Sequence, residues 1–253
     1  MVGLASVGLV GTASADERAN DTPSADELNA EIRRTFKAGD TDRVRRLLEG
    51  QELEYDLTTT TVTEPEPASD ADFGIQSRYS ESNSELSTVV TSATRNNCVW
   101  FTVNMSLDST HNRFRNARHV DDVVGIGFND DHWSIIGQPY ISVTDDYDVH
   151  SADFYSDSLS QGGLAGLVDL REAGQGPFPD RLPEQAYVTL QAQLQNLDDV
   201  PGTLWGSYEH TWASTSFGSI SSISGGTGPL SVDLSVASTA WDIADPADPK
   251  RAL

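Results

Sequence analysis

Residues 97–107, NCVWFTVNMSL, alternate between apolar and mostly polar side chains. Successive side chains of a β-strand point to opposite faces, so this alternation predicts one long strand with one face in a core. The run is too regular in steps of two to be a helix, and it sets the fold class for the residues around it. The expected core face is Val99, Phe101, Val103, Met105 and Leu107, and the opposite face is Cys98, Trp100, Thr102 and Asn104.

Further strand-like segments follow at short intervals and are separated by turn-forming residues. Asn129-Asp130-Asp131 is typical of a hairpin turn, and so is the glycine-rich run at 225–228. Many short strands punctuated by turns favour an antiparallel β-sandwich or jelly roll over a parallel sheet. Residues 162–172 are the one later segment expected to add a short helix. The other expected strands are 53–63, 123–128, 132–136, 139–144, 186–194, 203–213, 217–223 and 230–236.

A helical hairpin is predicted before the β-rich region. Ser24 and Glu27 have the spacing of a capping box, which predicts a helix over 25–38. A second short helix is expected to end at Gly50. This segment holds five of the fourteen arginines, so two interpretations stay open: a helix pair packed on the main domain, or a docking or pro-region.

The first fifteen residues, MVGLASVGLVGTASA, are small, apolar and uncharged, and they end in Ala13-Ser14-Ala15. This pattern predicts a secretory signal and an extracellular or cell-surface location. The segment is shorter than the about 20 apolar residues that span a bilayer, and no later segment is long and apolar enough to do so. The alternative is an ordinary apolar N-terminus.

The expected organisation follows from these segments and from the Pro-, Ser- and acid-rich stretch after residue 63. It comprises a signal-peptide remnant (1–15), the helical hairpin (16–50), a strand with an acidic linker (51–84), a β-sandwich domain (85–242) and a flexible tail (243–253).

The chain is strongly acidic and poor in lysine. It has 39 acidic residues, 16 basic residues and only two lysines, and its formal net charge is -23. Acid is spread along the whole length, which is typical of proteins that stay soluble in molar salt. No basic stripe offsets the repulsion of phosphate, so nucleic-acid binding is disfavoured.

The acidic, lysine-poor body, the signal-like start and the segment Tyr208-Glu209-His210-Thr211-Trp212 resemble exported haloarchaeal proteins. The resemblance in composition covers the whole chain, whereas the motif covers a few residues. It implies an archaeal, halophilic, secreted protein and transfers no catalytic residue.

Asp146, Asp148 and His150 share one face if residues 145–150 are extended, and such a set suits a divalent cation such as calcium. The alternative is a solvated acidic run, because the chain has 26 aspartates and neighbouring pairs arise often by chance. The expected cofactor is therefore none, with this set as the candidate metal site.

Tyr208, His210 and Trp212 would share one face of a strand. Such a face serves either as a stacking platform for a glycan or peptide ligand or as part of the core. Two glycosylation sequons occur, at Asn20 and Asn104.

The sequence contains no G-x-S-x-G, H-E-x-x-H, Walker or G-x-G-x-x-G motif, and no catalytic residue can be assigned. The leading hypothesis is a non-enzymatic binding or interaction module at or outside the cell surface. The alternatives are an extracellular hydrolase, metal-assisted through Asp146, Asp148 and His150, and a secreted effector whose N-terminal region is processed.

Overall fold

The computed structural model describes residues 23–51, 53–61, 84–108, 121–145, 151–155, 162–170, 185–200, 202–212, 219–235 and 238–253. These residues form a mainly β structure with antiparallel sheets and two short N-terminal helices, which confirms the predicted fold class.

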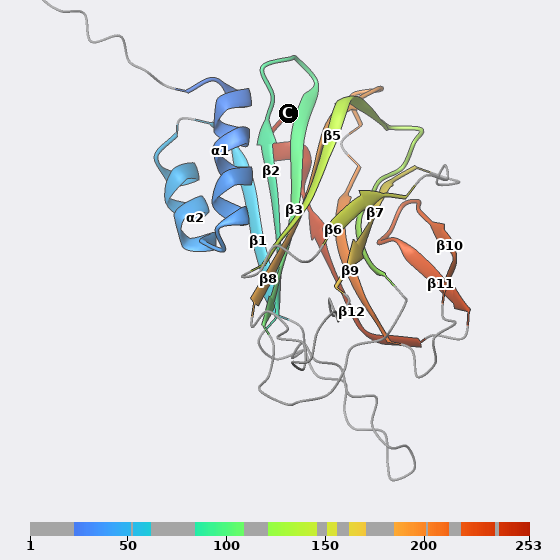
Figure 1. Cartoon of the computed structure of the whole chain (residues 1–253). Helices are drawn as coiled ribbons and strands as arrows, with labels where there is room; N and C mark the ends of the chain where they lie inside the picture. The colour runs from blue at the N-terminus through green and yellow to red at the C-terminus, as the bar shows by residue number, and fades with distance from the viewer. Residues whose placement is uncertain are drawn as a thin grey trace, which may run out of the picture.

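Two five-stranded sheets pack face to face (Figure 1). The first, called here the helix-side sheet, has the order β1–β2–β3–β8–β5, and the second, the hairpin-side sheet, has the order β12–β9–β4–β7–β6. The strands of the helix-side sheet are β1 (Tyr55–Thr61), β2 (Glu85–Ser92), β3 (Cys98–Asp108), β8 (Gln185–Asn196) and β5 (Trp133–Asp145). Those of the hairpin-side sheet are β12 (Ser238–Ala247), β9 (Leu204–Trp212), β4 (Asp122–Gly127), β7 (Leu164–Asp169) and β6 (Ser151–Phe154).

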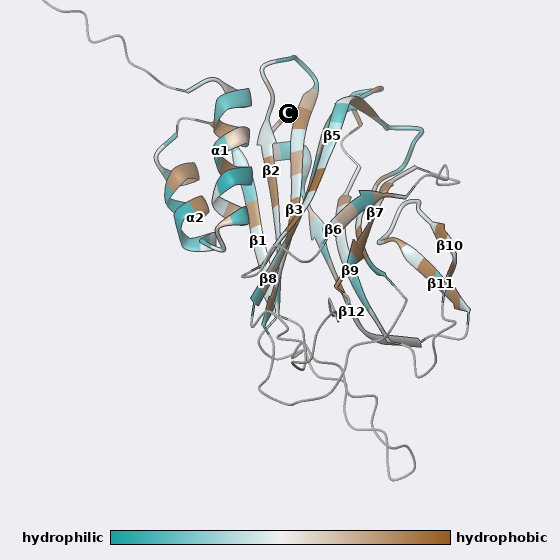
Figure 2. Ribbon diagram, viewed as in Figure 1, coloured by the Kyte–Doolittle hydropathy of each residue, from teal (hydrophilic) through white to brown (hydrophobic). Residues whose placement is uncertain are grey.

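The core lies between the two sheets, and β3 supplies its centre. The predicted core face of β3 is buried throughout, from Val99 to Leu107, and it packs against residues such as Ile126 and Tyr208 of the opposite sheet. Figure 2 shows the alternation of apolar and polar residues along the strands. The long strand at 98–108 was therefore correctly predicted in both its extent and its faces.

A hairpin of two strands, β10 (Ser219–Ser224) and β11 (Ser231–Ser235), covers the outer face of the hairpin-side sheet. Its apolar residues Ile223, Leu230 and Val232 pack against Val123 of β4. Gly125 of β4 lies directly beneath Leu230, where a Cβ would overlap the leucine side chain. The predicted turn at 225–228 is confirmed as the link between β10 and β11.

The two helices, α1 (Ala25–Lys37) and α2 (Thr41–Glu49), cover the outer face of the helix-side sheet. The predicted capping box is present, since the Ser24 hydroxyl accepts a hydrogen bond from the Glu27 amide and the Glu27 carboxylate accepts one from the Ser24 amide. The apolar residues of the helix pair surround Val89 of β2. Gly39 joins the helices with a φ of 69°, and a Cβ there would overlap the Tyr187 ring of β8.

Hydrogen bonds also fix the helices to the sheet. The Arg33 guanidinium donates to Gln191 Oε1 over 2.9 Å and lies 4.4 Å from the centre of the Tyr140 ring. The Thr91 hydroxyl donates to Asn29 Oδ1 over 3.0 Å. Arg34 and Arg43 both pair with Glu31 within the hairpin. The structure thus has the helix pair packed on the main domain, with Arg33 bonded to the sheet and Arg34 and Arg43 paired within the hairpin.

The predicted hairpin around Asn129-Asp130-Asp131 is wrong. The turn exists, because the Asn129 carbonyl accepts hydrogen bonds from the amides of His132 and Trp133, but β4 and β5 belong to different sheets. The chain crosses from one sheet to the other at this turn. A local turn pattern looks the same in both cases, because only the pairing partners of the flanking strands distinguish them.

The short helix expected at 162–172 is also wrong, because Leu164–Asp169 is strand β7. It pairs with β4 on one side and β6 on the other. Gly162 and Gly163 precede it with φ values of 88° and 131°, a conformation that does not begin a helix. A short apolar run fits a buried strand as well as a helix, and here tertiary pairing decides.

The expected flexible tail at 243–253 is strand and helix instead. β12 continues to Ala247, a 3-10 helix follows at Pro249–Arg251, and Ala252 is buried in the core. β12 is an edge strand, so Pro246 lies in it without requiring a hydrogen-bond donor on its outer side. Of the two Asp-Pro steps, Asp245-Pro246 therefore lies in an edge strand, and Asp248-Pro249 begins the 3-10 helix.

Asp245 of β12 bonds to a strand of the opposite sheet, and its burial makes the stability of the fold depend on pH. It is 5% exposed, and its Oδ2 accepts a hydrogen bond from the Thr88 hydroxyl over 3.1 Å. Burial raises the pKa of its carboxyl above 3.8 and the nearby Asp56 charge adds to this, against hydrogen bonds from Thr88 and Thr60 that lower it. The folded state therefore binds this proton more tightly than the unfolded chain does.

Replacing Asp245 by asparagine is expected to raise the melting temperature at neutral pH, because the buried charge is removed while an acceptor for Thr88 remains. The gain should disappear below pH 3.8, where the wild-type carboxyl is protonated in both states. Thermal melts of both proteins between acidic and neutral pH, at constant salt, measure it. Asp242→Asn, at an exposed position of the same strand, is the control. A gain that does not vary with pH would contradict the assignment.

Within the part of the chain that the structure describes, no helix has the length and apolar character needed to cross a membrane.

Candidate functional site

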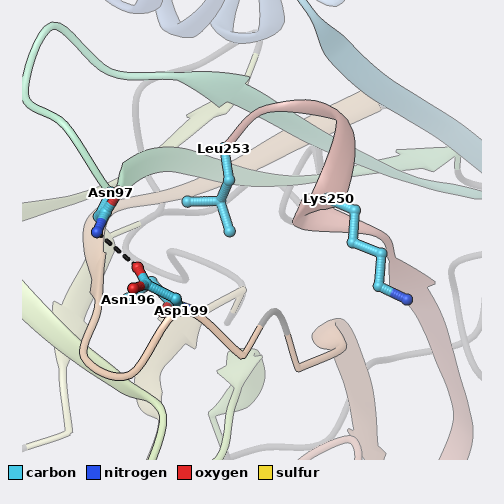
Figure 3. Close-up of a pocket in the computed structure, with 5 residues that line it drawn as sticks. All are labelled: Asn97, Asn196, Asp199, Lys250 and Leu253. Atoms are coloured by element: carbon cyan, nitrogen blue, oxygen red, sulfur yellow. Dashed lines mark hydrogen bonds between the residues drawn. The ribbon is translucent and has the colours of Figure 1, made fainter.

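A surface pocket of about 180 Å³ lies at one end of the sandwich (Figure 3). Three segments distant in sequence form it: the turn between β2 and β3, the loop after β8, and the residues after β12. Its lining residues are Asn97, Asn196, Asp199, Lys250 and Leu253.

Two of these residues have an unusual backbone. Asn97 and Asp199 have φ values of 56° and 57°, in the left-handed region that side chains other than glycine seldom occupy. Asparagine and aspartate tolerate it best. In this conformation the Asn97 side-chain amide donates to Asp199 Oδ1 over 2.7 Å, and the Asn97 carbonyl accepts from the Asn196 amide over 2.8 Å. The turn and the loop are therefore held together at the pocket.

Asn196 forms the inner part of the pocket and is only 3% exposed. Its side-chain nitrogen donates to the Val200 carbonyl over 3.0 Å, which fixes the orientation of the amide. Its Oδ1 is buried and has no hydrogen-bond partner among the described residues. A buried acceptor left in this state costs about 1 to 3 kcal/mol.

The neighbouring Asp198 fixes the same loop through hydrogen bonds with His132 and the Val200 amide. Burial opposes its charged form, but hydrogen bonds from His132 and from the Val200 amide outweigh it and hold the pKa of Asp198 below 3.8. His132 Nδ1 lies 2.6 Å from Asp198 Oδ2, and the Val200 amide donates to Asp198 Oδ1 over 3.1 Å. The loop that carries Asp199 is thus anchored before any ligand arrives.

The segments that form the pocket carry exposed apolar residues. Leu197, Val200 and Leu253 are 52%, 49% and 45% exposed, and they are the large hydrophobic residues most exposed in the described part of the chain. All three belong to the segments that form the pocket. Single exposed apolar residues are common, but a concentration of them in the segments that form one polar pocket is typical of a binding site.

The predicted platform on β9 lies inside the molecule. Tyr208 and His210 share one face, as expected, but they are only 1% and 2% exposed, so no external ring can stack on them. The prediction that they bind a ligand is wrong for this reason. Trp212 belongs to β9, and its side chain lies outside the described residues.

Tyr208 and His210 instead surround Asp122 at the start of β4, a residue that is 3% exposed. Asp122 Oδ2 accepts from the Tyr208 hydroxyl over 2.7 Å and lies 2.6 Å from His210 Nδ1. Asp122 Oδ1 accepts from the Thr211 amide over 2.9 Å. A carboxylate bonded in this way keeps the proton on His210 Nδ1. We call these four residues the Asp122 cluster; it ties β4 to β9.

The candidate metal residues Asp146, Asp148 and His150, and the sequon at Asn20, lie outside the described residues. Within the described part of the chain, no group of three or more His, Cys, Asp or Glu side chains is placed to hold a metal ion. Asn104 is 1% exposed, and its Oδ1 accepts from the Thr189 hydroxyl over 2.9 Å. The folded protein therefore buries Asn104, which contradicts the prediction that this residue accepts a glycan.

Sequence reasoning missed the pocket. Asp199 stands between the expected strands 186–194 and 203–213, where aspartate is typical of turns, so its positive φ value was within reach of the sequence, whereas Asn97 begins the strand-like run 97–107. Asn196 gave no such signal, because its burial depends on the loop that folds over it.

Comparison with protein-family models and with curated proteins finds no match for this chain.

Proposed function

We propose that this protein is an exported, salt-adapted binding module without enzymatic activity, and that the pocket at Asn97, Asn196 and Asp199 is its ligand site. The observation that carries the proposal is a preorganised polar pocket lined by the exposed Leu253, with the exposed Leu197 and Val200 in the same loop as Asp199. Loops held by a rigid sheet are the usual place for recognition, because the sheet fixes their positions.

The structure gives both described acid–imidazole pairs a role in holding the fold. His210 and Asp122 lie in the interior and join β4 to β9. His132 and Asp198 fix the loop beside the pocket through the Val200 amide. These contacts support a module that recognises a ligand in preference to a hydrolase.

Composition supports the location and the solvent of this proposal. A net charge of -23 with two lysines suits a protein that works in molar salt, and the apolar start resembles an export signal. The expected site of action is therefore at or outside the cell surface. No resident cofactor is part of the proposal.

Saturation-transfer NMR in molar NaCl tests the ligand site. A mixture of methyl glycosides, N-acetyl amino acids and short peptides would be screened against the wild type and against Asp199→Gly. Glycine accepts a φ of 57° without strain, so this variant removes the carboxylate and its bond to Asn97 without straining the backbone. At least one probe is expected to give a signal that falls about tenfold in the variant, the factor for one lost hydrogen bond to a charged group.

Asp131→Gly, which removes an exposed carboxylate from a turn outside the pocket, is the matched control and should keep the signal. A screen in which no probe gives a signal, or in which Asp199→Gly retains all signals, would refute the pocket as the ligand site.

A further inference from the structure

We infer that two copies of this protein associate in molar salt through the edge of β1 that faces away from β2, so that their helix-side sheets join into one sheet. The inference is independent of the pocket at Asn97 and Asp199. It follows from the backbone groups that β1 presents, from a comparison of β1 with the other edge strands, and from the side chains of the strand.

β1 is paired on one side. It lies against β2 from Tyr55 to Thr61 without a register shift. Within the described part of the chain, the backbone of β1 forms hydrogen bonds with β2 alone. In an antiparallel pair, alternate residues direct their amide and carbonyl groups away from the partner strand, so β1 offers these groups to a further strand.

The other three edge strands of the two described sheets carry features that oppose pairing with a further strand. The register of β5 against β8 shifts between Ile136 and Tyr140, around Pro139. β12 contains Pro246 and a register shift against β9, and β6 has only four residues. Bulges, prolines and very short strands protect sheet edges from association, and β1 has none of these features.

The side chains of β1 are engaged within the protein, which leaves its backbone for a partner. Tyr55 and Leu57 pack against the helix pair, and the Thr60 hydroxyl bonds to Asp245 of the opposite sheet. A peptide that adds to a sheet edge is selected by pockets for its side chains beside the strand. A second copy needs only the same backbone edge, so the edge of β1 favours a second copy.

A second copy fits this edge without opposing like charges. The start of the strand lies beside the C-terminal 3-10 helix, because the Asp248 amide donates to Asp56 Oδ2 over 3.0 Å. Residues 57–61, Leu-Thr-Thr-Thr-Thr, carry no charge in a chain with 39 acidic residues. An antiparallel pair with its two-fold axis at Thr59 places only leucine and threonine opposite one another, and threonine pairs across strands are favourable.

Net charge determines the conditions under which the two copies can meet. Each copy carries a charge of -23, so the copies repel one another in dilute buffer. At about 1 M salt the Debye length is roughly 3 Å, and this repulsion is largely screened. Because a pair of five-residue strands is a small contact, the dimer is expected to be weak and concentration-dependent.

Sedimentation equilibrium of the full chain in molar NaCl tests the inference. The average mass is expected to rise from 27.3 kDa toward twice this value as the protein concentration increases. Hydrogen exchange followed by NMR locates the contact: alternate amides of β1 should exchange more slowly as the dimer fraction rises, whereas those of β5 and β12 should not change. A monomer at every concentration, or a dimer whose β1 amides exchange as in the monomer, would overturn the inference.

Thr59→Lys and Thr59→Asp separate the β1 edge from other surfaces. Each variant places two like charges opposite one another at the two-fold axis, where enclosure by the interface limits screening, and should raise the dimer dissociation constant about fivefold. An equimolar mixture of the two variants should associate more tightly than either variant alone, because lysine then faces aspartate. Thr59 is exposed, so both variants should keep the wild-type fold, which circular dichroism checks.

Thr203→Lys, at an exposed position outside β1, is the matched control and should dimerise as the wild type does. Dimerisation that neither Thr59 variant weakens, or a mixture that associates no better than its components, would assign the contact to another surface and reject the β1 edge.

Discussion

Replacing Asp122 by alanine is expected to lower the free energy of unfolding by about 3 kcal/mol or more, because three buried donors lose a shared acceptor at about 1 to 3 kcal/mol each. The variant loses the acceptor shared by the Tyr208 hydroxyl, the His210 ring and the Thr211 amide, all in the interior. Those donors lie on β9 and Asp122 begins β4, so the substitution weakens the contact between these two strands. At Thr211 the two bonded residues are 89 positions apart in the sequence. Chemical denaturation in molar NaCl measures the change.

Asp122→Asn tests whether charge or shape matters. It keeps one acceptor oxygen in the same place, so its loss should be smaller than that of alanine. Asp131→Ala, on an exposed turn, removes the same charge and should change stability by no more than about 0.5 kcal/mol. An Asp122→Ala variant as stable as this control would mean that the Asp122 cluster does not stabilise the fold.

The whole chain is expected to unfold cooperatively as NaCl is lowered from molar to millimolar concentration. Its net charge is -23, and the Debye length lengthens from roughly 3 Å at 1 M salt to about 30 Å at 0.01 M. Carboxylates that hardly interact in brine then repel one another across the surface. Circular dichroism melts over a series of NaCl concentrations measure the effect.

Screening and solute exclusion are separated by the choice of solute. Sucrose strengthens burial without screening charge, so it should restore only part of the melting temperature that NaCl supports. A melting temperature that is the same in dilute buffer and in brine would refute the halophilic interpretation of the composition.

The sequence predicted most where a pattern is local. The alternation at 97–107 identified both faces of β3, and Ser24 with Glu27 located the start of α1. Prediction from the sequence failed where residues distant in the chain determine the structure. β4 and β5 flank a turn yet belong to different sheets, and β7 is a strand because β4 and β6 pair with it. The edge position of β12, which explains Pro246, is likewise a property of the whole sheet.

The same limit applies to the site. His210 was recognised as a residue of chemical interest, but the carboxylate beside it is 88 residues away and no spacing rule connects them. In the sequence Asn97 began a strand-like run and Asp199 was an ordinary turn residue, and they meet only because β3 and β8 are neighbours in the sheet. Side-chain chemistry was visible in the sequence, whereas proximity was not.

The order of strands in the helix-side sheet also determines when the protein can fold. β3 pairs with β8, and Thr88 of β2 bonds to Asp245 of β12, 157 residues later. Because β12 and Ala252 complete the core, the sandwich cannot close until these residues have left the ribosome. Contacts of such long range also make folding slow. The core is therefore complete only after residues 238–252 have been synthesised, so it cannot close on a nascent chain that is still shorter than this.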